Sequence, residues 1–342
     1  MYEKYRKNNI MNVNFLVNQA TFMRYYVPLA YEVKMRRHIA NFFIGKKPKK
    51  YNDPMYKRNF ENIKGICKYF KFNLFKIEDC KNFDGITFNI EGNGIKYANK
   101  STQKLVTLTC MNDATARYNG KDAQYINEVD NVILASEFMA KHLNTISHKN
   151  MYLGSPKYDF PLNKDKILHR YKLNSKEKYA LILYPKLRDL KKINLNKIYD
   201  YLRKLGYKLL VKTREKDPVL FHEHRGDFYF LDASWFPSTT IELLNVSDIV
   251  INFSSTAIKE CVMCKTPVIN FDIKPFKLLF DFLYKYDYII HLDPNVSFDI
   301  FSMAVKKLTT QNLESEFNLA IKNHLFESGN VSKKICDALN IL

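Results

Sequence analysis

The sequence predicts an α/β protein in which parallel strands form two domains. Short apolar runs alternate with longer amphipathic segments along the chain, which is the pattern of parallel sheets covered by helices. At roughly 150 residues per domain, 342 residues indicate about two domains. Hydrophobic residues make up 46% and charged residues 26% of the chain, so the composition is that of a globular protein and not of a disordered one.

The composition also limits the class of protein and the cellular compartment that we expect. No stretch reaches the roughly 18 uncharged apolar residues of a membrane span, which excludes an integral membrane protein. No apolar core follows the basic first residues, so a cleaved secretory signal is not expected. Six cysteines in this length do not make a disulfide scaffold. We therefore expect a cytoplasmic protein, with peripheral association at the inner face of the membrane as a further option.

The first half is predicted to hold one αβ domain. We expect strands at 13–17, 39–44, 86–90, 105–110 and 132–135. A polar turn at 18–21 leads into a helix through Pro28, and residues 56–75, which are basic and aromatic, are expected to form a second helix. Ser136 can cap a further helix after the last of these strands.

The second half repeats the pattern. Strands are expected at 179–184, 207–212, 228–231, 248–253 and 267–271, and helices at 194–205, 239–245, 256–264, 300–308 and 313–340. Gly206 is a natural end for the first of these helices. A polar, charged stretch at 161–175 separates the two apolar regions, which predicts domains at 1–160 and 161–342. The last helix can pack back on the N-terminal domain.

The charge of the chain is concentrated near its start. The formal net charge is +19, and residues 1–100 hold 20 basic and 8 acidic side chains. This surplus suggests an anionic partner, such as a phosphorylated or lipid-linked glycan, a phospholipid surface or nucleic acid. A Lys-rich, AT-biased coding sequence is the alternative explanation.

One segment combines a buried strand with a turn rich in hydroxyl groups. Residues 248–253 are followed by Ser254, Ser255 and Thr256, which open the helix expected at 256–264. Hydroxyls and backbone N–H groups at a helix N-terminus suit a phosphate. Glu260, about one helical turn further on, can accept hydrogen bonds from ribose hydroxyls. An ordinary helix cap is the alternative.

The motifs of the second half resemble the donor-binding domain of GT-B glycosyltransferases, and most of all the CDP-glycerol glycerophosphotransferase group. They occur in the same order, as Asp232-Ala233-Ser234, Glu242-Leu243-Leu244, Ser247-Asp248, Ser254-Ser255 and Lys265-Thr266-Pro267-Val268-Ile269. Gly154-Ser155-Pro156-Lys157-Tyr158-Asp159 and Glu327-Ser328-Gly329-Asn330-Val331-Ser332 resemble segments at the domain junction and before the last helix of such enzymes. The resemblance covers about residues 150–340.

The resemblance implies a GT-B fold, with two facing Rossmann-like domains and a cleft between them. A nucleotide-sugar donor is then expected on the second domain and an acceptor on the first. Lys212 and Arg214 end a strand and can stabilise the leaving diphosphate, with a solvated strand end as the alternative. Trp235 and Phe236 can stack on a nucleobase or simply plug a hydrophobic loop.

The N-terminal domain departs from the polyol-phosphate transferases. Their His-Gly-Thr turn is replaced by a strand end that reads Thr109-Cys110-Met111-Asn112-Asp113, so their base does not carry over. Asp113 is our candidate for the general base, with a turn-capping aspartate as the alternative. Asn112, together with Asn18, Gln19 and Arg24 after the first strand, is expected to line the cleft.

We expect no metal and no bound cofactor. No Asp-x-Asp triplet occurs, so cationic side chains and helix dipoles are expected to replace a metal at the diphosphate. Cys261 and Cys264 have no second pair of ligands in matching positions, so core packing explains them better than zinc.

The sequence therefore predicts metal-independent transfer of a sugar from a nucleotide-sugar to a hydroxyl acceptor in surface glycan or polysaccharide biosynthesis. A polyol-phosphate transferase with a CDP-activated donor is one alternative. A nucleic-acid-modifying glucosyltransferase, a nucleotide-sugar epimerase and a non-catalytic basic binding module are the others. The fold alone does not choose among them.

Overall fold

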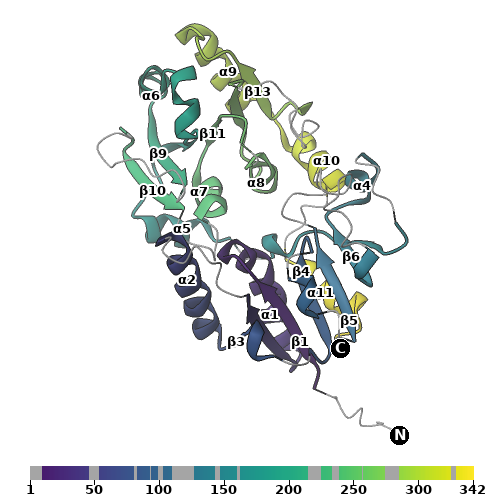
Figure 1. The fold of residues 1–342 in the computed structure, drawn as a ribbon. Coiled ribbons are helices and arrows are strands. Elements are labelled where there is room, and N and C mark those ends of the chain that lie inside the picture. The colour runs from purple at the N-terminus through teal and green to yellow at the C-terminus, as the bar shows by residue number, and fades with distance from the viewer. Residues whose placement is uncertain are drawn as a thin grey trace, which may run out of the picture. The chain divides into compact units, whose positions relative to one another are not determined.

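The computed structural model describes most of the chain as two compact units. It describes residues 10–45, 54–80, 83–92, 94–98, 103–109, 127–142, 147–159, 162–214, 225–232, 239–255, 257–273, 285–324 and 329–342. Unit 1 comprises Met1–Phe160 and Glu327–Leu342, and unit 2 comprises Pro161–Phe326. Each unit is a parallel sheet with helices on its faces (Figure 1).

Unit 1 contains a seven-stranded parallel sheet in the order β3-β2-β1-β4-β5-β6-β7. Its strands are β1 (Asn12–Val17), β2 (Ile39–Ile44), β3 (Asn73–Lys76), β4 (Ile86–Ile90), β5 (Lys104–Leu108), β6 (Asn131–Leu134) and β7 (Asn150–Tyr152). Its helices are α1 (Met23–Met35), α2 (Pro54–Phe70), α3 (Ile95–Ala98), α4 (Glu137–His142) and α11 (Val331–Ala338). Strands β2 and β3 lie on one side of β1 in the sheet, and β4 lies on its other side. The strand order therefore reverses between β1 and β4.

Stacked aromatic side chains form the centre of the core of unit 1. The Phe15 ring lies 5.0 Å from that of Phe42 and 5.4 Å from that of Phe88, and all three are fully buried. Tyr26 of α1 packs on Phe15 and donates its hydroxyl proton to the Leu16 carbonyl over 3.2 Å. The buried phenol is thus satisfied, and α1 is held on the sheet.

The last helix belongs to unit 1. The backbone N–H groups of Val331 and Ser332, at the start of α11, donate to the two carboxylate oxygens of Asp159. At its other end Asp337 pairs with Arg36, which follows α1, over 2.7 Å. A carboxylate at the N-terminus and a cation near the C-terminus both favour the helix dipole.

Unit 2 contains a six-stranded parallel sheet in the order β10-β9-β8-β11-β12-β13. Its strands are β8 (Lys178–Leu183), β9 (Tyr207–Arg214), β10 (Phe228–Asp232), β11 (Ile249–Asn252), β12 (Val268–Phe271) and β13 (Ile289–Leu292). Its helices are α5 (Lys164–Tyr171), α6 (Leu195–Lys204), α7 (Thr239–Val246), α8 (Ile258–Met263), α9 (Phe298–Thr310) and α10 (Glu314–His324). The strand order reverses between β8 and β11, as in the dinucleotide-binding fold.

Three aspartates bind the backbone at the amino ends of the strands. Asp248 accepts a hydrogen bond from the Tyr179 N–H, Asp227 from the Leu209 N–H and Asp130 from the Leu105 N–H, each over 2.7 Å. Each aspartate lies just before its own strand and satisfies an N–H group at the start of the neighbouring strand, which would otherwise go unbonded at the sheet edge.

The α/β class and the two parallel sheets are as predicted, and most of the expected elements are present. The predicted helix 56–75 was wrong in its last turn: α2 ends at Phe70, and residues 73–76 form β3. The predicted helix 313–340 is two helices, α10 and α11. Strands β7 and β13 and helix α5, inside the polar stretch 161–175, were not predicted.

Candidate functional site

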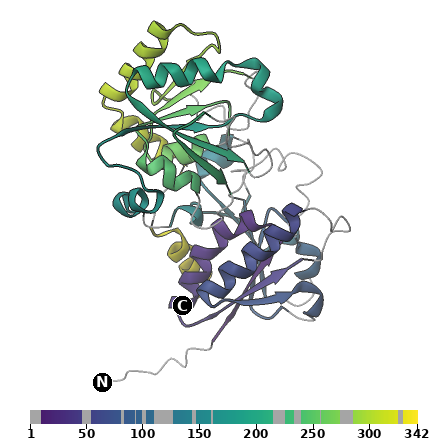
Figure 2. The ribbon, with the colours of Figure 1, turned by 90° about the vertical axis from the view of Figure 1, so that its left-hand side faces the viewer.

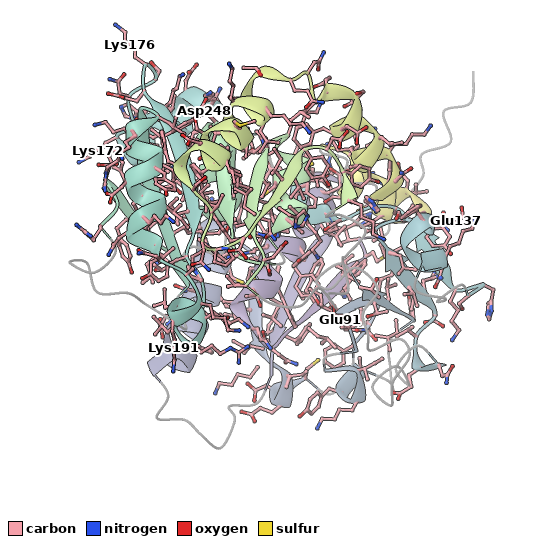
Figure 3. The ribbon with its side chains drawn as sticks, turned by 90° about the horizontal axis from the view of Figure 1, so that it is seen from above. Glu91, Glu137, Lys172, Lys176, Lys191 and Asp248 are labelled. Atoms are coloured by element: carbon pink, nitrogen blue, oxygen red, sulfur yellow. The ribbon has the colours of Figure 1, made fainter. Side chains whose placement is uncertain are left out.

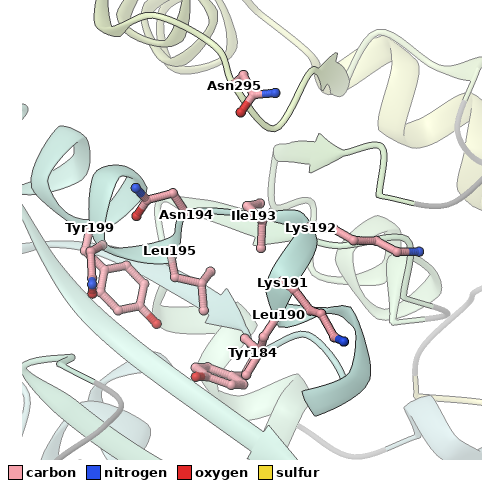
Figure 4. Close-up of a pocket in the computed structure, with 10 residues that line it drawn as sticks. Tyr184, Leu190, Lys191, Lys192, Ile193, Asn194, Leu195, Tyr199 and Asn295 are labelled. Carbon is pink, nitrogen blue, oxygen red and sulfur yellow. The ribbon is translucent and has the colours of Figure 1, made fainter.

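An open pocket of about 540 Å³ lies in unit 2, next to the segments that follow β8 and β13. Tyr184, which follows β8, lies at its base. The short helix η5 (Leu187–Lys192) and the first turn of α6 form one wall, and Asn295, after β13, lies opposite (Figure 4). The pocket thus adjoins β8, where the strand order reverses, and ligands of open α/β sheets bind at this position.

Lysine and amide groups dominate the lining of the pocket. Lys191 and Lys192 extend from the end of η5, as Figure 4 shows, and both are exposed. The Lys192 ammonium donates to the Ile273 carbonyl over 3.3 Å and lies 3.7 Å from the buried carboxylate of Asp189. These contacts fix one ammonium group at the rim, where it favours an anionic ligand.

The start of α6 adds backbone donors to the same wall. The Asn194 side chain caps the helix by accepting the Lys197 N–H over 3.1 Å. Lys197 in turn donates from its ammonium to the Asn295 carbonyl over 3.2 Å, which ties the helix to the opposite loop. The N–H groups of the first helical turn have no partners within the helix, and together with the helix dipole they favour a phosphate.

A row of polar side chains crosses the carboxyl ends of β11, β12 and β13. Asn270 accepts from the Asn252 amide over 2.8 Å and donates to Asp272 over 2.7 Å, and His291 Nδ1 lies 2.9 Å from the same Asp272 oxygen. The N–H of Ser254, which has φ of 52°, donates to Asn270 over 3.0 Å. This row fixes the turn after β11.

The predicted donor residues are partly brought together by this turn. Ser254 is buried in it, and the hydroxyl of the adjacent Ser255 accepts the Ala257 N–H over 3.4 Å. Helix α8 begins at Ile258, two residues later than predicted, so the hydroxyl residues precede the helix and do not cap it. Glu260 is buried in the first turn of α8.

Lys212 lies at the end of β9, beside the pocket. Its side chain is only 8% exposed, so it is not a solvated strand end, and its carbonyl accepts the N–H of Tyr184 over 3.0 Å. Of Arg214 the structure describes only the backbone, as the last residue of β9. Trp235, Phe236 and Thr256 lie outside the described residues.

On unit 1, three of the predicted cleft residues follow β1. The Asn18 amide lies close to Gly45, because a Cβ added to Gly45 would stand 2.5 Å from Asn18 Oδ1. Gln19 is exposed, and Arg24 is half-buried in the first turn of α1. Asn112 and Asp113 lie outside the described residues. The role of these residues stays a prediction.

Glu91 is a carboxylate that the sequence analysis missed. It follows β4, next to the point where the strand order of unit 1 reverses, and is 6% exposed with φ of 50° (Figure 3). A left-handed backbone is uncommon in a residue other than glycine and is often found at functional sites. The signal in the sequence was the turn Glu91-Gly92-Asn93-Gly94 directly after an apolar strand.

Two motifs that carried the resemblance lie away from the pocket. Asp248 is at the amino edge of the sheet and Lys191 at the carboxyl edge, and Figure 3 shows the two apart within unit 2. Glu242 is buried between Arg170 and Tyr171 of α5, both of which donate to its carboxylate. Burial and the hydrogen bond to Glu242 raise the pKa of Tyr171. The two hydrogen bonds show that Glu242 joins α7 to α5.

The Cys261 and Cys264 pair is a packing feature. Cys261 is fully buried, and burial, reinforced by the carboxylate of Glu260, raises the pKa of its thiol. The thiol of Cys264 points to the Ile241 carbonyl at 3.7 Å. Within the described part of the chain, no group of three or more histidine, cysteine or acidic side chains is placed to hold a metal ion.

Solved structures with this arrangement are known. A UDP-GlcNAc 2-epimerase from Neisseria meningitidis, bound to UDP-GlcNAc, matches 96% of this chain and 100% of its own, with 12% identity and a TM-score of 0.65. The glycotransferase of kitacinnamycin matches 98% and 100%, with 9% identity and a TM-score of 0.61. The wall teichoic acid polymerase TagF matches 96% and 88%, with 13% identity and a TM-score of 0.58.

The chain has the GT-B fold. No protein-family model and no curated protein matches the sequence, and at these identities the likeness to solved structures shows the fold alone. Among the helices that the structure describes, none is long and apolar enough to cross a membrane.

Residues 186–192 form a basic run in the sequence, and its last two residues, Lys191 and Lys192, line the pocket. Asn295 reaches the same pocket from a strand that was not predicted. The position of these residues in the sequence could have indicated the pocket. Both segments follow strands, and the carboxyl ends of parallel strands lie at the same edge of the sheet.

Proposed function

We propose that the protein transfers a sugar from a nucleotide-sugar donor to a hydroxyl acceptor without a metal ion. The observation that carries the proposal is the pocket at the carboxyl end of β8, with Lys191 and Lys192 on its wall. An acceptor that is a lipid-linked or phosphorylated glycan matches the basic surplus of the first 100 residues.

The proposed role of the two lysines is to stabilise the leaving group. When the bond between the anomeric carbon and the diphosphate oxygen breaks, the electron pair stays on the diphosphate. The ammonium groups of Lys191 and Lys192 and the N-terminus of α6 offer positive charge to that oxygen. Together they supply the charge that a metal provides in other transferases.

Transfer to a hydroxyl with inversion at the anomeric carbon also needs a base. The acceptor oxygen forms the new bond to the anomeric carbon, and its proton passes to a carboxylate. We assign this role to Asp113 or Glu91 of unit 1. Glu91 is a candidate because it is buried next to the point where the strand order reverses. Asp113 is a candidate because it follows an expected strand.

The turn after β11 is the proposed site for the rest of the donor. Ser254, Ser255 and Glu260 lie on the turn and the short helix after β11, the strand that neighbours β8. Hydroxyl and carboxylate groups there can bind ribose or sugar hydroxyls, while Lys212, Arg214, Trp235, Phe236 and Thr256 keep their predicted roles around the nucleotide.

The test is a panel of nucleotides measured by thermal unfolding. UDP, GDP, CDP, dTDP and CMP, with their common sugar conjugates, are each added to the full chain. A ligand at about 100 times its dissociation constant adds about 2.7 kcal/mol to the free energy of unfolding. We expect a shift with one base. No shift with any of these nucleotides would overturn the proposal.

A variant locates the site. Glu260→Ala is expected to weaken binding of the nucleotide that gives the shift, while Glu314→Ala, an exposed glutamate on α10 of the same unit, leaves binding unchanged. Equal affinity in both variants means that the donor does not use the turn after β11.

Two solved structures with the same fold each suggest an alternative function. TagF has the same fold, and a structure of it was solved after a soak with CDPG, so a response to CDP conjugates alone would favour polyol-phosphate transfer. The epimerase was solved with UDP-GlcNAc. Conversion of UDP-GlcNAc in the absence of any acceptor, followed by NMR, would favour epimerisation.

A further inference from the structure

The C-terminal ends of α1 and α2 form an exposed surface of aromatic, apolar and basic side chains. Tyr69 is 80%, Met35 65% and Tyr31 52% exposed. Exposed lysines at 64, 68 and 71 lie beside them on α2 and just after it. We refer to these six residues, Tyr31, Met35, Lys64, Lys68, Tyr69 and Lys71, as the aromatic–basic patch.

Ring contacts hold the two tyrosines of the patch in place. The ring of Tyr31 packs edge-on against Phe70 at 6.3 Å, and Tyr69 packs against the same ring at 4.9 Å. Phe70 in turn stacks on the buried Phe72 at 5.5 Å. The Lys34 ammonium donates to the Phe70 carbonyl over 2.9 Å and joins the ends of the two helices, which lie side by side in Figure 2.

The charge of this surface is positive. Lys64 and Lys68 follow one another by four residues on α2, and Arg37, just after α1, is exposed too. Two neighbouring carboxylates, Glu32 and Asp337, both pair with Arg36 at 2.8 and 2.7 Å, which neutralises part of their charge. On α2 itself the described carboxylate is Glu61, one turn before Lys64.

We propose that the aromatic–basic patch docks unit 1 on the surface of an anionic phospholipid bilayer. Tyrosine rings favour the depth of the lipid head groups, and an exposed methionine is stabilised by leaving water. Lysines beside them are attracted by the negative surface of the bilayer. Positive charge suits any anionic partner, and the exposed methionine and tyrosines beside it favour the bilayer, because its head-group layer can take up apolar side chains.

Lysine rather than arginine around the patch also favours lipid. Nucleic-acid surfaces rely on arginine, whose planar group bonds phosphates and base edges in pairs. Here Arg36 is engaged by two carboxylates, and the exposed cations described around the patch are mostly lysines, at 64, 68 and 71, beside the arginine Arg37. Tyr69 and Met35 project outward, where they can enter the head-group layer as on interfacial helices.

The experiment is co-sedimentation of the full chain with vesicles. Binding is expected to vesicles of equimolar phosphatidylglycerol and phosphatidylcholine, and not to vesicles of phosphatidylcholine alone. Each lysine near an anionic surface contributes about fivefold, so the double variant K64Q/K68Q is expected to partition about 25-fold less at low salt. The pair Y69S/M35S is expected to lower binding without changing its dependence on salt.

Matched controls separate the patch from overall charge. Lys306 and Lys307 are exposed on α9 of unit 2 beside Met303, which is 72% exposed. K306Q/K307Q and M303S remove the same groups elsewhere and are expected to bind as the parent does. All substitutions are at exposed positions, and thermal unfolding checks that each variant is folded.

Three results would overturn the proposal. The first is no binding to anionic vesicles by the parent chain. The second is an equal loss in the α9 controls, which would mean that net charge and not the patch binds. The third is a short DNA duplex that displaces the vesicles and whose own binding is lost in K64Q/K68Q but not in Y69S/M35S, which would assign the surface to nucleic acid.

Discussion

Replacement of Lys192 by alanine is the sharpest test of the pocket. Lys192 lies at its rim with its ammonium 3.3 Å from the Ile273 carbonyl and 3.7 Å from Asp189. A bound diphosphate would gain one close cation from it. Lys192→Ala removes that cation and leaves the buried carboxylate of Asp189 without the Lys192 ammonium beside it. Binding of a nucleoside diphosphate is therefore expected to weaken.

The expected loss of diphosphate affinity depends on how exposed the Lys192 side chain is. Two unit charges 4 Å apart interact by about 1 kcal/mol in water and about 4 kcal/mol at an effective dielectric constant of 20. The side chain of Lys192 is 52% exposed, so a value near the lower limit applies, and Asp189 already offsets part of the charge. We expect a loss of about 1.4 kcal/mol, which is a tenfold weaker dissociation constant.

Isothermal titration calorimetry measures this loss. UDP and CDP are titrated against the parent, Lys192→Ala and the control Lys204→Ala, an exposed lysine at the far end of α6. The matching nucleosides, without phosphates, serve as the uncharged comparison. The loss should shrink as salt screens the pair. Unchanged diphosphate affinity in Lys192→Ala, or an equal loss with the nucleoside, would refute the placement of the diphosphate.

Three further predictions concern stability. Asp248→Ala, which frees the Tyr179 N–H, should lower the free energy of unfolding by about 1–2 kcal/mol in urea titrations without changing nucleotide affinity. Glu242→Ala should cost about 2 kcal/mol in the same assay, because Arg170, half exposed, can return to water. Burial raises the pKa of Cys67 and Cys336 to about 12 from 9.0. The unfolded chain therefore loses these protons first, and stability should fall between about pH 9 and 12 by about 1.4 kcal/mol per pH unit for each thiol. Urea titrations across this range should show a shallower decline in C67A/C336A.

The fold was predictable because each strand of the two sheets is a short apolar run. The element boundaries that were wrong have local causes. Helix α2 ends at Phe70 with Lys71 in a left-handed conformation, and no glycine marks the end. The N–H of Phe72 donates back to the Cys67 carbonyl over 2.9 Å and closes the turn. Lysine at such a position gives no signal in the sequence.

The site was predictable only in part. The turn after β11 had a recognisable hydroxyl run, and Lys212 was expected at the end of β9, where it lies. The pocket itself joins η5 to a loop about a hundred residues later, through Lys197 and Asn295. The contact between these two segments depends on strand order, and no local sequence pattern predicts the order of strands in a parallel sheet.

The two edges of the unit 2 sheet use their polar groups differently. At the amino edge, Asp227 and Asp248 are bound to backbone N–H groups, so their oxygens serve the sheet. At the carboxyl edge, Asp189 and Asp272 lie beside Lys192 and His291. Lys192 thus offsets the charge of Asp189 at the carboxyl edge, while Lys191 is exposed in the pocket. A carboxyl edge at which Lys192 offsets Asp189 and Lys191 is exposed in the pocket favours an anionic ligand. That difference is the physical reason for our proposal that a nucleoside diphosphate binds there.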